Sequence, residues 1–288
     1  KVVVKNAMNQ KQGTQGWTKD ISVPPTAYDH GCSEIDDHRM IIVGGFDAEK
    51  RTNLSSGVIY NSRTQKWMDL PNDMPQALVK FSFVANAKYA FVIGGENQYG
   101  FMVNRLYRLS LETFIWTVMA SLRYVFDYSA AVLKWNYIYL FGGWGNDGPL
   151  VSAWRYSISH NLWELLPDMP SARYGHSAVV LGKDVYLAGG YDDGSLAIFD
   201  TVSLRWKTED NPSDMPKSIC HTAAVVLKDR YLVVIGGMDS HSGHILRSCF
   251  IYDSIFNCWS ETPSSMNIHV DRAGHSATVL DGKVVVYG

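Results

Sequence analysis

The sequence predicts an all-β protein built from repeated four-stranded units. Six tryptophans recur along the chain, and each is followed 26 to 30 residues later by a glycine. Five of these glycines begin a Gly-Gly pair, and the sixth is the last residue. No stretch has a sustained 3.6-residue hydrophobic period, so little or no helix is expected. The tryptophans are Trp17, Trp67, Trp116, Trp163, Trp206 and Trp259, and the glycines are Gly44, Gly94, Gly142, Gly189, Gly236 and Gly288.

One unit, residues 176–209, shows the plan of the repeat. It contains four apolar or β-branched runs, and a turn or a glycine pair separates each run from the next. Gly182-Lys183 is the predicted hairpin turn, and the second run ends at Gly189-Gly190. The predicted strands are 176–181, 184–188, 195–199 and 205–209, and their counterparts in another unit are 81–86, 89–93, 103–109 and 115–119. Each unit is therefore predicted to be an antiparallel meander.

Such a unit, of about 48 residues, cannot bury both faces of its small sheet, so neighbouring units must stack on it. Radial stacking around an axis gives a β-propeller, which leaves only short, protected edges. The glycine pair suits a crowded axis, where a side chain would clash or where the turn needs φ > 0. The recurring tryptophan supplies a large apolar plate that packs against the next unit.

Several motifs of the chain resemble those of the kelch-repeat family. A hydrophobic strand ends at Gly-Gly, and after a loop the next strand ends in a Tyr-Asp-like pair about six residues before a tryptophan. These pairs are Tyr60-Asn61 before Trp67, Phe199-Asp200 before Trp206, and Tyr252-Asp253 before Trp259. The segments 169–176 and 272–275 also resemble the kelch link between blades.

The resemblance covers essentially the whole chain and departs from the pattern in two places. Leu78 stands where the family has arginine, and Leu109-Ser110 replaces the Tyr-Asp pair. The resemblance implies a kelch-type β-propeller. It also implies an adaptor or scaffold role, in some members as the substrate receptor of a ubiquitin ligase.

The repeats predict a single domain over residues 1–288 with six blades of four antiparallel strands. The tail is expected to supply the two inner strands of the last blade. Residues 2–5 and 14–17 near the start are expected to supply its outer strands, so that strands from both termini close the ring. The alternative is a fragment of a larger propeller or of a longer protein. The predicted blades are 31–70, 81–119, 128–166, 176–209, 221–262, and a closing blade made from 1–20 and 275–288.

Composition excludes several classes of partner. The net charge is −2, with 26 basic and 28 acidic residues and no run of five like charges, so no nucleic-acid partner is predicted. The longest apolar stretches are strand-sized, so no membrane insertion is expected. Four cysteines are too few for a disulfide scaffold and favour a cytoplasmic location without establishing it. Cys249 and Cys258 flank a predicted turn, and a bridge between them stays open if they are directly opposed.

Function is expected on the face where the glycine pairs end and the first strands begin, because the variable loops gather there. Trp144 is the strongest candidate, since it follows its glycine pair in a Gly-rich loop where a core role is less obvious. Arg123, Arg173 and Arg272 are interpreted either as forks for an acidic peptide or as packing between blades. The candidate partner contacts are Trp144, Phe46, Tyr191, Glu96, Met238, Tyr99, Phe101, Arg123, Arg173 and Arg272.

Alignment on the glycine pairs places six residues at one equivalent position near the channel mouth. Four histidines there could hold a metal, but in kelch-like repeats a histidine at this place commonly fixes the interblade loop. No metal, cofactor or catalytic residue is predicted, because turn chemistry explains the Asp-rich loops and no nucleophile or phosphate-binding motif occurs. The six residues are His30, Phe81, Tyr128, His176, His221 and His275.

The predicted function is therefore a non-catalytic scaffold or adaptor that binds another protein or a peptide through this face. The alternative is a propeller enzyme or a carbohydrate-binding protein that uses the mouth lined by histidine and aromatic residues, with or without a metal.

Overall fold

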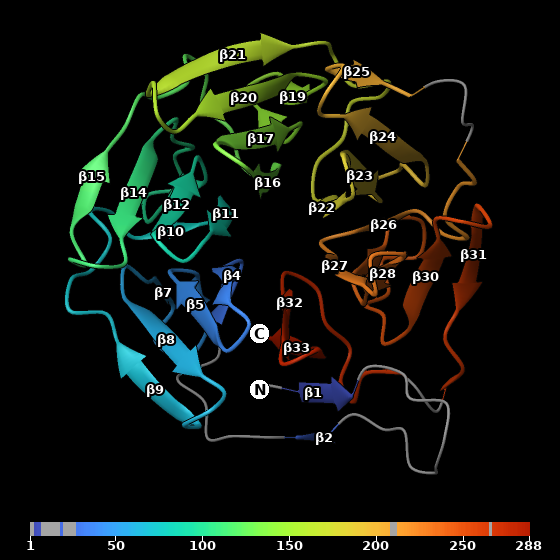
Figure 1. The fold of residues 1–288 in the computed structure, drawn as a ribbon, viewed down its shortest axis with the longest axis horizontal. Coiled ribbons are helices and arrows are strands. Elements are labelled where there is room, and N and C mark those ends of the chain that lie inside the picture. Colours follow the sequence, from blue (N-terminus) through green and yellow to red (C-terminus); the bar gives the residue numbers. More distant parts are fainter. Residues whose placement is uncertain (1–2, 7–17, 20–26, 208–211, 265–266) are drawn as a thin grey trace.

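The computed structural model describes residues 3–6, 18–19, 27–207, 212–264 and 267–288. Within these residues it contains six four-stranded antiparallel sheets and no α-helix, so the predicted all-β class is confirmed. Figure 1 shows the sheets side by side around a centre, with successive strands of each sheet lying farther out. In the described part of the chain, no helix has the length and apolar character to span a membrane.

Five sheets are each formed by one continuous segment. Sheet 1 contains β4 (Gly31–Asp36), β5 (Arg39–Val43), β8 (Gly57–Asn61) and β9 (Lys66–Asp69). Sheet 2 contains β11 (Ser82–Ala85), β12 (Tyr89–Ile93), β14 (Leu106–Ser110) and β15 (Trp116–Val118). Sheet 3 contains β16 (Ala130–Lys134), β17 (Tyr137–Phe141), β20 (Ala153–Ser157) and β21 (Leu162–Leu166). Sheet 4 contains β22 (Ser177–Leu181), β23 (Asp184–Ala188), β24 (Leu196–Asp200) and β25 (Arg205–Trp206). Sheet 5 contains β27 (Ala223–Leu227), β28 (Tyr231–Ile235), β30 (Cys249–Asp253) and β31 (Cys258–Glu261).

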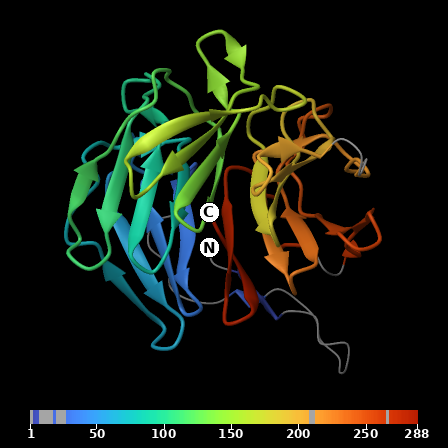
Figure 2. The same ribbon diagram turned by 45° about the horizontal axis from the view of Figure 1, so that its top comes forward.

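Sheet 6 combines the two ends of the chain. Its order is β2 (Thr18–Lys19), β1 (Val3–Asn6), β33 (Lys283–Tyr287) and β32 (Ser276–Leu280). β1 pairs antiparallel with β33, and Val4 lies opposite Val285. Figure 2 shows the blue β1 beside the red β33. The predicted outer strand at 14–17, with Trp17, lies outside the described residues.

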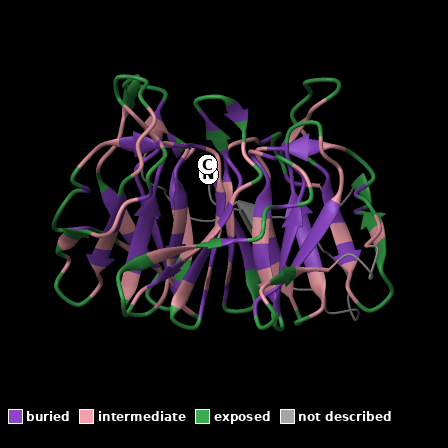
Figure 3. Cartoon of the chain, turned by 90° about the horizontal axis from the view of Figure 1, so that it is seen from above, coloured by how far each residue is buried: buried purple, intermediate pink, exposed green. Residues whose placement is uncertain are grey.

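Short two-residue strands organise the loops at one end of the sheets. They are β3 (Ala27–Tyr28), β6 (Phe46–Asp47), β7 (Thr52–Asn53), β10 (Leu78–Val79), β13 (Glu96–Asn97), β18 (Trp144–Gly145), β19 (Gly148–Pro149), β26 (Ile219–Cys220) and β29 (Met238–Asp239). Most pair a segment before a first strand with the segment after the glycine pair of the same sheet. Figure 3 shows buried residues along the strands and exposed residues in the loops at both ends.

Second strands match the prediction most closely, because alternation and the glycine pair mark both of their ends. The strands 89–93 and 184–188 are found with these bounds. The third strand expected at 103–109 begins later, at Leu106. Val103, the predicted first residue of this strand, belongs to the preceding loop, because its amide donates to the Gly95 carbonyl at 2.8 Å.

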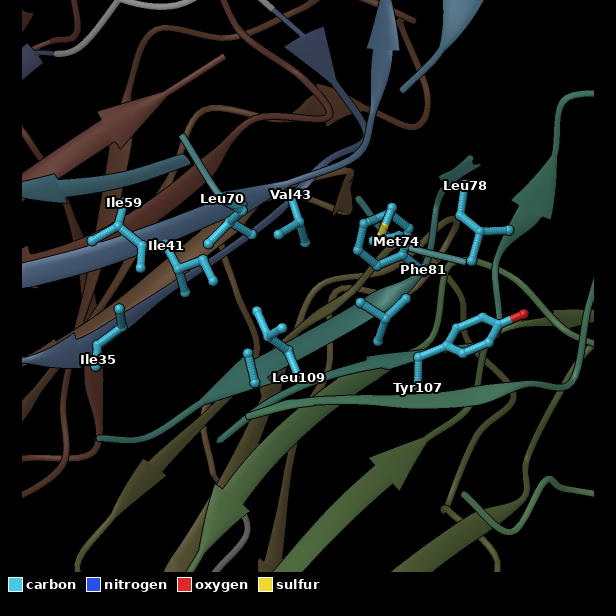
Figure 4. Packing of buried hydrophobic residues seen from close by; sticks show 12 residues of the cluster. Ile35, Ile41, Val43, Ile59, Leu70, Met74, Leu78, Phe81, Tyr107 and Leu109 are labelled. Carbon is cyan, nitrogen blue, oxygen red and sulfur yellow. The ribbon is translucent and has the colours of Figure 1, made fainter. Parts of the chain in front are cut away.

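The hydrophobic core lies between neighbouring sheets. One cluster joins sheets 1 and 2 through Ile41, Val43 and Leu109, among others (Figure 4). Similar clusters join each later sheet to the next and sheet 6 to sheet 1. Trp116 packs on the first of these clusters, and its indole donates to the Asn72 carbonyl at 3.2 Å. Trp67, Trp163, Trp206 and Trp259 pack on the equivalent clusters. The predicted packing of these tryptophans between units is confirmed, but the predicted direction is wrong. Each one packs against the preceding sheet and not the next, because its indole reaches back to the cluster on that side, where all but Trp67 also donate to a carbonyl.

The cysteine pair does not meet the condition for a bridge. In the β30–β31 ladder Cys258 lies opposite Asp253, and the Cys249 carbonyl accepts a hydrogen bond from the Thr262 amide at 2.9 Å. The two cysteines are therefore offset along the hairpin. Neither of them forms a disulfide.

Candidate functional site

Six residues that lie two positions before the first strands form a ring of backbone hydrogen bonds. Each amide donates to the carbonyl of the corresponding residue in the preceding sheet, at 2.7–3.1 Å, and the sixth bond returns to the first residue. Every member has a left-handed backbone, with φ between 49° and 66°. We call these residues the backbone ring. They are Asp29, Lys80, Tyr128, Gly175, His221 and Gly274.

The backbone ring corrects the alignment made from the glycine pairs. Tyr128 and His221 belong to the ring, whereas His30, Phe81, His176 and His275 lie one residue later, in line with Ser129 and Thr222. The number of residues between the backbone ring and the glycine pair is not the same in every sheet. It is larger in sheet 1, because β4 contains a bulge, and in sheet 5, because three residues connect β27 to β28. Both rows line a cavity of about 130 Å³ at the channel mouth.

The buried histidines of the second row fill space against glycines of the preceding sheet. A Cβ atom on Gly142 would lie 3.1 Å from Cε1 of His176, and one on Gly236 would lie 3.0 Å from Cε1 of His275. Burial lowers the pKa of His176 and His275 to about 3 and that of His30 to about 4. These are the properties of packing groups. No three histidine, cysteine or acidic side chains within the described residues are grouped to hold a metal ion.

Four charged residues lie at or beside the mouth, and we call them the mouth cluster: Asp29, Lys80, Glu96 and Asp127. Asp29 and Lys80 line the cavity, whereas Glu96 and Asp127 lie beside it. Lys80 Nζ lies 2.9 Å from Glu96 Oε2. Burial raises the pKa of Asp29 to about 6, although Lys80 opposes the shift. Burial also raises the pKa of Asp127 to about 6. Asp127 is 5% exposed, and its Oδ1 has no hydrogen-bond partner in the described structure.

An aromatic surface adjoins the mouth cluster. Trp144 packs edge-on against Tyr174 with ring centroids 4.9 Å apart, and Tyr174 stacks on Tyr191 at 5.4 Å. Tyr128 of the backbone ring lies 6.3 Å from Tyr174 and donates from its hydroxyl to Asp29 Oδ2 at 3.3 Å. Trp144 and Tyr191 remain 39% and 41% exposed. We call these four rings the aromatic surface.

Sequence reasoning missed Asp29, Lys80, Asp127 and Tyr174. The first three each directly precede a predicted channel-mouth residue, and Tyr174 lies inside the motif interpreted as the interblade link. The structure supplies a signal for Asp29 and Lys80, because four of the six backbone-ring positions hold Asp, Lys, Tyr or His rather than glycine despite their left-handed backbone. Side chains seldom occupy such a conformation without a reason.

The other predicted contacts lie around this centre. Phe46 packs against Tyr28, with ring centroids 5.2 Å apart. Tyr99 and Phe101 are 73% and 69% exposed in the loop after β13. Arg123 is exposed, and Met238 is half-buried in β29.

Arg173 and Arg272 do not reach this surface, and the structure favours the packing interpretation for both. Arg173 is 1% exposed, and its guanidinium donates to the carbonyls of Gly189 and Ser195 at 3.3 and 3.1 Å. It also forms an ion pair with Asp193 at 3.0 Å. Arg272 is buried too. We therefore leave both arginines out of the proposed contact surface.

Comparison with known proteins identifies the family. The KLHDC2/KLHL20/DRC7 Kelch-repeats domain matches residues 6–190 and again residues 123–288, which together span nearly the whole chain. The chain belongs to the kelch-repeat family. The predicted resemblance is confirmed.

Curated kelch relatives are longer than this chain. Kelch-like protein 36 of Mus musculus is 26% identical over 275 residues, which cover 91% of this chain and 44% of the relative. Kelch-like protein 15 of Homo sapiens is 24% identical over 82% of this chain and 42% of its own length. Beta-scruin of Limulus polyphemus is 31% identical over 56% of this chain and 19% of its own length. The chain thus spans less than half the length of these relatives.

The buried histidines of this kelch domain predict a specific acid sensitivity. A histidine held neutral in the fold takes up a proton only on unfolding, so between pH 6 and pH 4 it lowers stability by about 1.4 kcal/mol per pH unit as the pH falls. His176→Phe introduces the residue that sheet 2 carries at the equivalent position, Phe81. We expect the free energy of unfolding of this variant, measured by urea denaturation at pH 4, 5 and 6, to fall with decreasing pH by about 1.4 kcal/mol per pH unit less than that of the parent protein.

A variant in the exposed β29 loop, His241→Phe, is the control and should leave the pH dependence unchanged. Equal pH dependence in His176→Phe and the parent protein would contradict the assignment of His176 as a neutral packing group.

Proposed function

We propose that this kelch-repeat chain is an interaction scaffold or adaptor that binds another protein or a peptide through the aromatic surface. The observation that carries the proposal is the packing of Trp144, Tyr174 and Tyr191, from three separate segments, into one partly exposed group. Tryptophan and tyrosine are enriched among residues that dominate binding energy, because each buries a large area at a low cost in side-chain entropy.

The comparisons support this proposal at the level of the family. The kelch-like relatives are more than twice as long as the part that matches, and we propose that the chain is the partner-binding part of such a protein. Proteins suit the mouth better than nucleic acids do, because the mouth cluster holds three carboxylates and one ammonium group among the described residues. Phosphate groups would be repelled there.

We also propose that the six sheets are six blades of one complete ring, closed by the pairing of β1 with β33. Three features support closure. The six bonds of the backbone ring return to their starting residue. A hydrophobic cluster joins sheet 6 to sheet 1, as clusters join the other neighbours. β1 pairs with β33 along four residues. Closure positions the mouth, since residues from all six sheets line it.

The binding role is tested by comparing two tryptophans at opposite ends of sheet 3. Trp144 follows the glycine pair, whereas Trp135 lies in the β16–β17 turn and is 66% exposed. Trp144→Ala should lower the amount of each specific partner captured by the purified protein by at least about tenfold, as expected for a hot-spot residue. The melting temperature should stay close to that of the parent.

Trp135→Ala is the matched control and should capture the same partners as the parent protein. Quantitative mass spectrometry of the captured proteins gives the comparison. Equal capture by Trp144→Ala and Trp135→Ala would refute the proposed contact surface.

A further inference from the structure

The mouth cluster carries more negative charge than the described residues around it balance. Lys80 is its one ammonium group, and it is paired with Glu96 at 2.9 Å. Asp29 receives the Tyr128 hydroxyl at 3.3 Å, which is a neutral donor. His221 brings no compensating charge, because burial and the nearby Lys80 lower its pKa. Asp29, which lines the cavity, and Asp127, which lies beside it, thus have no cation of their own among the described residues.

Asp127 independently provides a hydrogen-bond acceptor that has no donor within the described residues. Its side chain is more than nine-tenths buried, and Oδ1 lacks a hydrogen-bond partner in the part of the chain that is described. The charges of Lys80, Glu96 and Asp29 act on its carboxyl group, so it lies near the other three members of the mouth cluster. A buried carboxylate oxygen without a hydrogen-bond partner costs stability, and groups of this kind cluster at sites that bind a ligand.

The aromatic surface lies directly beside this acceptor. Asp127 and Trp144 exchange both backbone hydrogen bonds, at 3.0 and 2.8 Å, and this pairing fixes the carboxylate next to the rings. Burial raises the pKa of the Tyr174 hydroxyl, and the charge of Asp127 adds a small part of the shift. Lys80 Nζ already lies 5.3 Å from the centre of the Tyr128 ring, which shows that this surface accepts a cation over an aromatic face.

We propose that the mouth binds a lysine or arginine side chain of the partner, with Asp29 and Asp127 as its carboxylate acceptors and the aromatic surface along its stem. This inference rests on the proposed function and names the chemistry of the partner. A long basic side chain fits because its aliphatic stem packs on rings while its charged end reaches buried acceptors. A metal ion fits poorly, because the acidic and histidine side chains of the described residues form no group that converges on one point.

Two blocked pentapeptides test the inference, Ala-Ala-Arg-Ala-Ala and its Gln counterpart. The signal is the indole N–H resonance of Trp144 in protein labelled with ¹⁵N-tryptophan, assigned with Trp144→Phe. The arginine peptide should shift this resonance saturably, and the glutamine peptide should not. Asp29→Asn and Asp127→Asn should each weaken the arginine peptide about tenfold, as expected for loss of a charge-assisted hydrogen bond.

Asp147→Asn is the matched control, since it removes an exposed carboxylate from the nearby β18–β19 turn. It should bind the arginine peptide like the parent protein. Equal responses to the two peptides, or full binding by the Asp29→Asn, Asp127→Asn double variant, would overturn the inference.

Partner capture separates this inference from the function on which it rests. If capture needs Trp144 but is unchanged in the double aspartate variant, the aromatic contact surface is supported and the binding of a basic side chain is refuted. If capture is unchanged in Trp144→Ala as well, the proposed function itself fails.

Discussion

Replacement of Gly95 by alanine should lower the free energy of unfolding by about 4 kcal/mol, through left-handed strain and overpacking. Gly95 is the second glycine of its pair and has φ = 95°. A Cβ atom there would lie 2.6 Å from the Val79 carbonyl oxygen and 2.8 Å from Phe81 Cβ. Neither neighbour can move freely, because Val79 is in β10 and Phe81 packs in the core between sheets 1 and 2.

Gly182→Ala separates steric overlap from backbone strain alone. Gly182 has φ = 60° in the β22–β23 turn, and a Cβ atom there would meet nothing within 4 Å. Its replacement should therefore cost only about 1 kcal/mol. Urea denaturation of the two variants measures both values. Equal losses would show that close packing at the glycine pair contributes nothing beyond the backbone conformation.

A disulfide between the chain ends should stabilise the protein by about 5 kcal/mol if β1 and β33 close the ring. Val4 and Val285 are opposed in the antiparallel ladder, and opposed residues have Cα separations that permit a disulfide. We expect oxidised Val4→Cys, Val285→Cys protein to be a cross-linked monomer with a raised midpoint of denaturation. The large gain follows from the length of chain that the bond encloses.

Peptide mapping by mass spectrometry identifies the bond and excludes linkage to the four native cysteines. The two single-cysteine variants are the controls, and oxidation should not stabilise them. Cross-links that form only between two molecules would contradict closure within one chain.

The strands and their order were predictable because their signals are local. Alternating apolar residues and the turn Gly182-Lys183 mark a hairpin without reference to the rest of the chain. Packing of the tryptophans between units was also predictable, since one large apolar side chain recurs at the same place in each repeat. The side was not, because only the structure shows that they pack against the preceding sheet. The start of the third strand at Leu106 was not, because the Val103 amide bonds to a loop carbonyl instead.

The candidate site was predicted less completely, for a different reason. Trp144 and Tyr191 were identified because each follows a glycine pair. Tyr174, whose ring lies between theirs, comes from a segment that the sequence pattern indicated only as the link between blades. Arg173 comes from the same segment and has the opposite orientation, since its guanidinium is buried against Ser195 and Asp193. Two neighbouring residues thus have opposite roles that residue type does not reveal.

The sequence by itself determined the all-β class, the repeated meander and the kelch family of this protein, because each depends on patterns within about 50 residues. Only the tertiary structure decided which residues meet at the mouth. A bulge in β4 and a longer β27–β28 turn each add one residue between the backbone ring and the glycine pair, so counting from the glycines shifts sheets 1 and 5 relative to the other four. The backbone ring restores the correct correspondence, because hydrogen bonds between neighbouring sheets depend on position in space and not on distance along the chain.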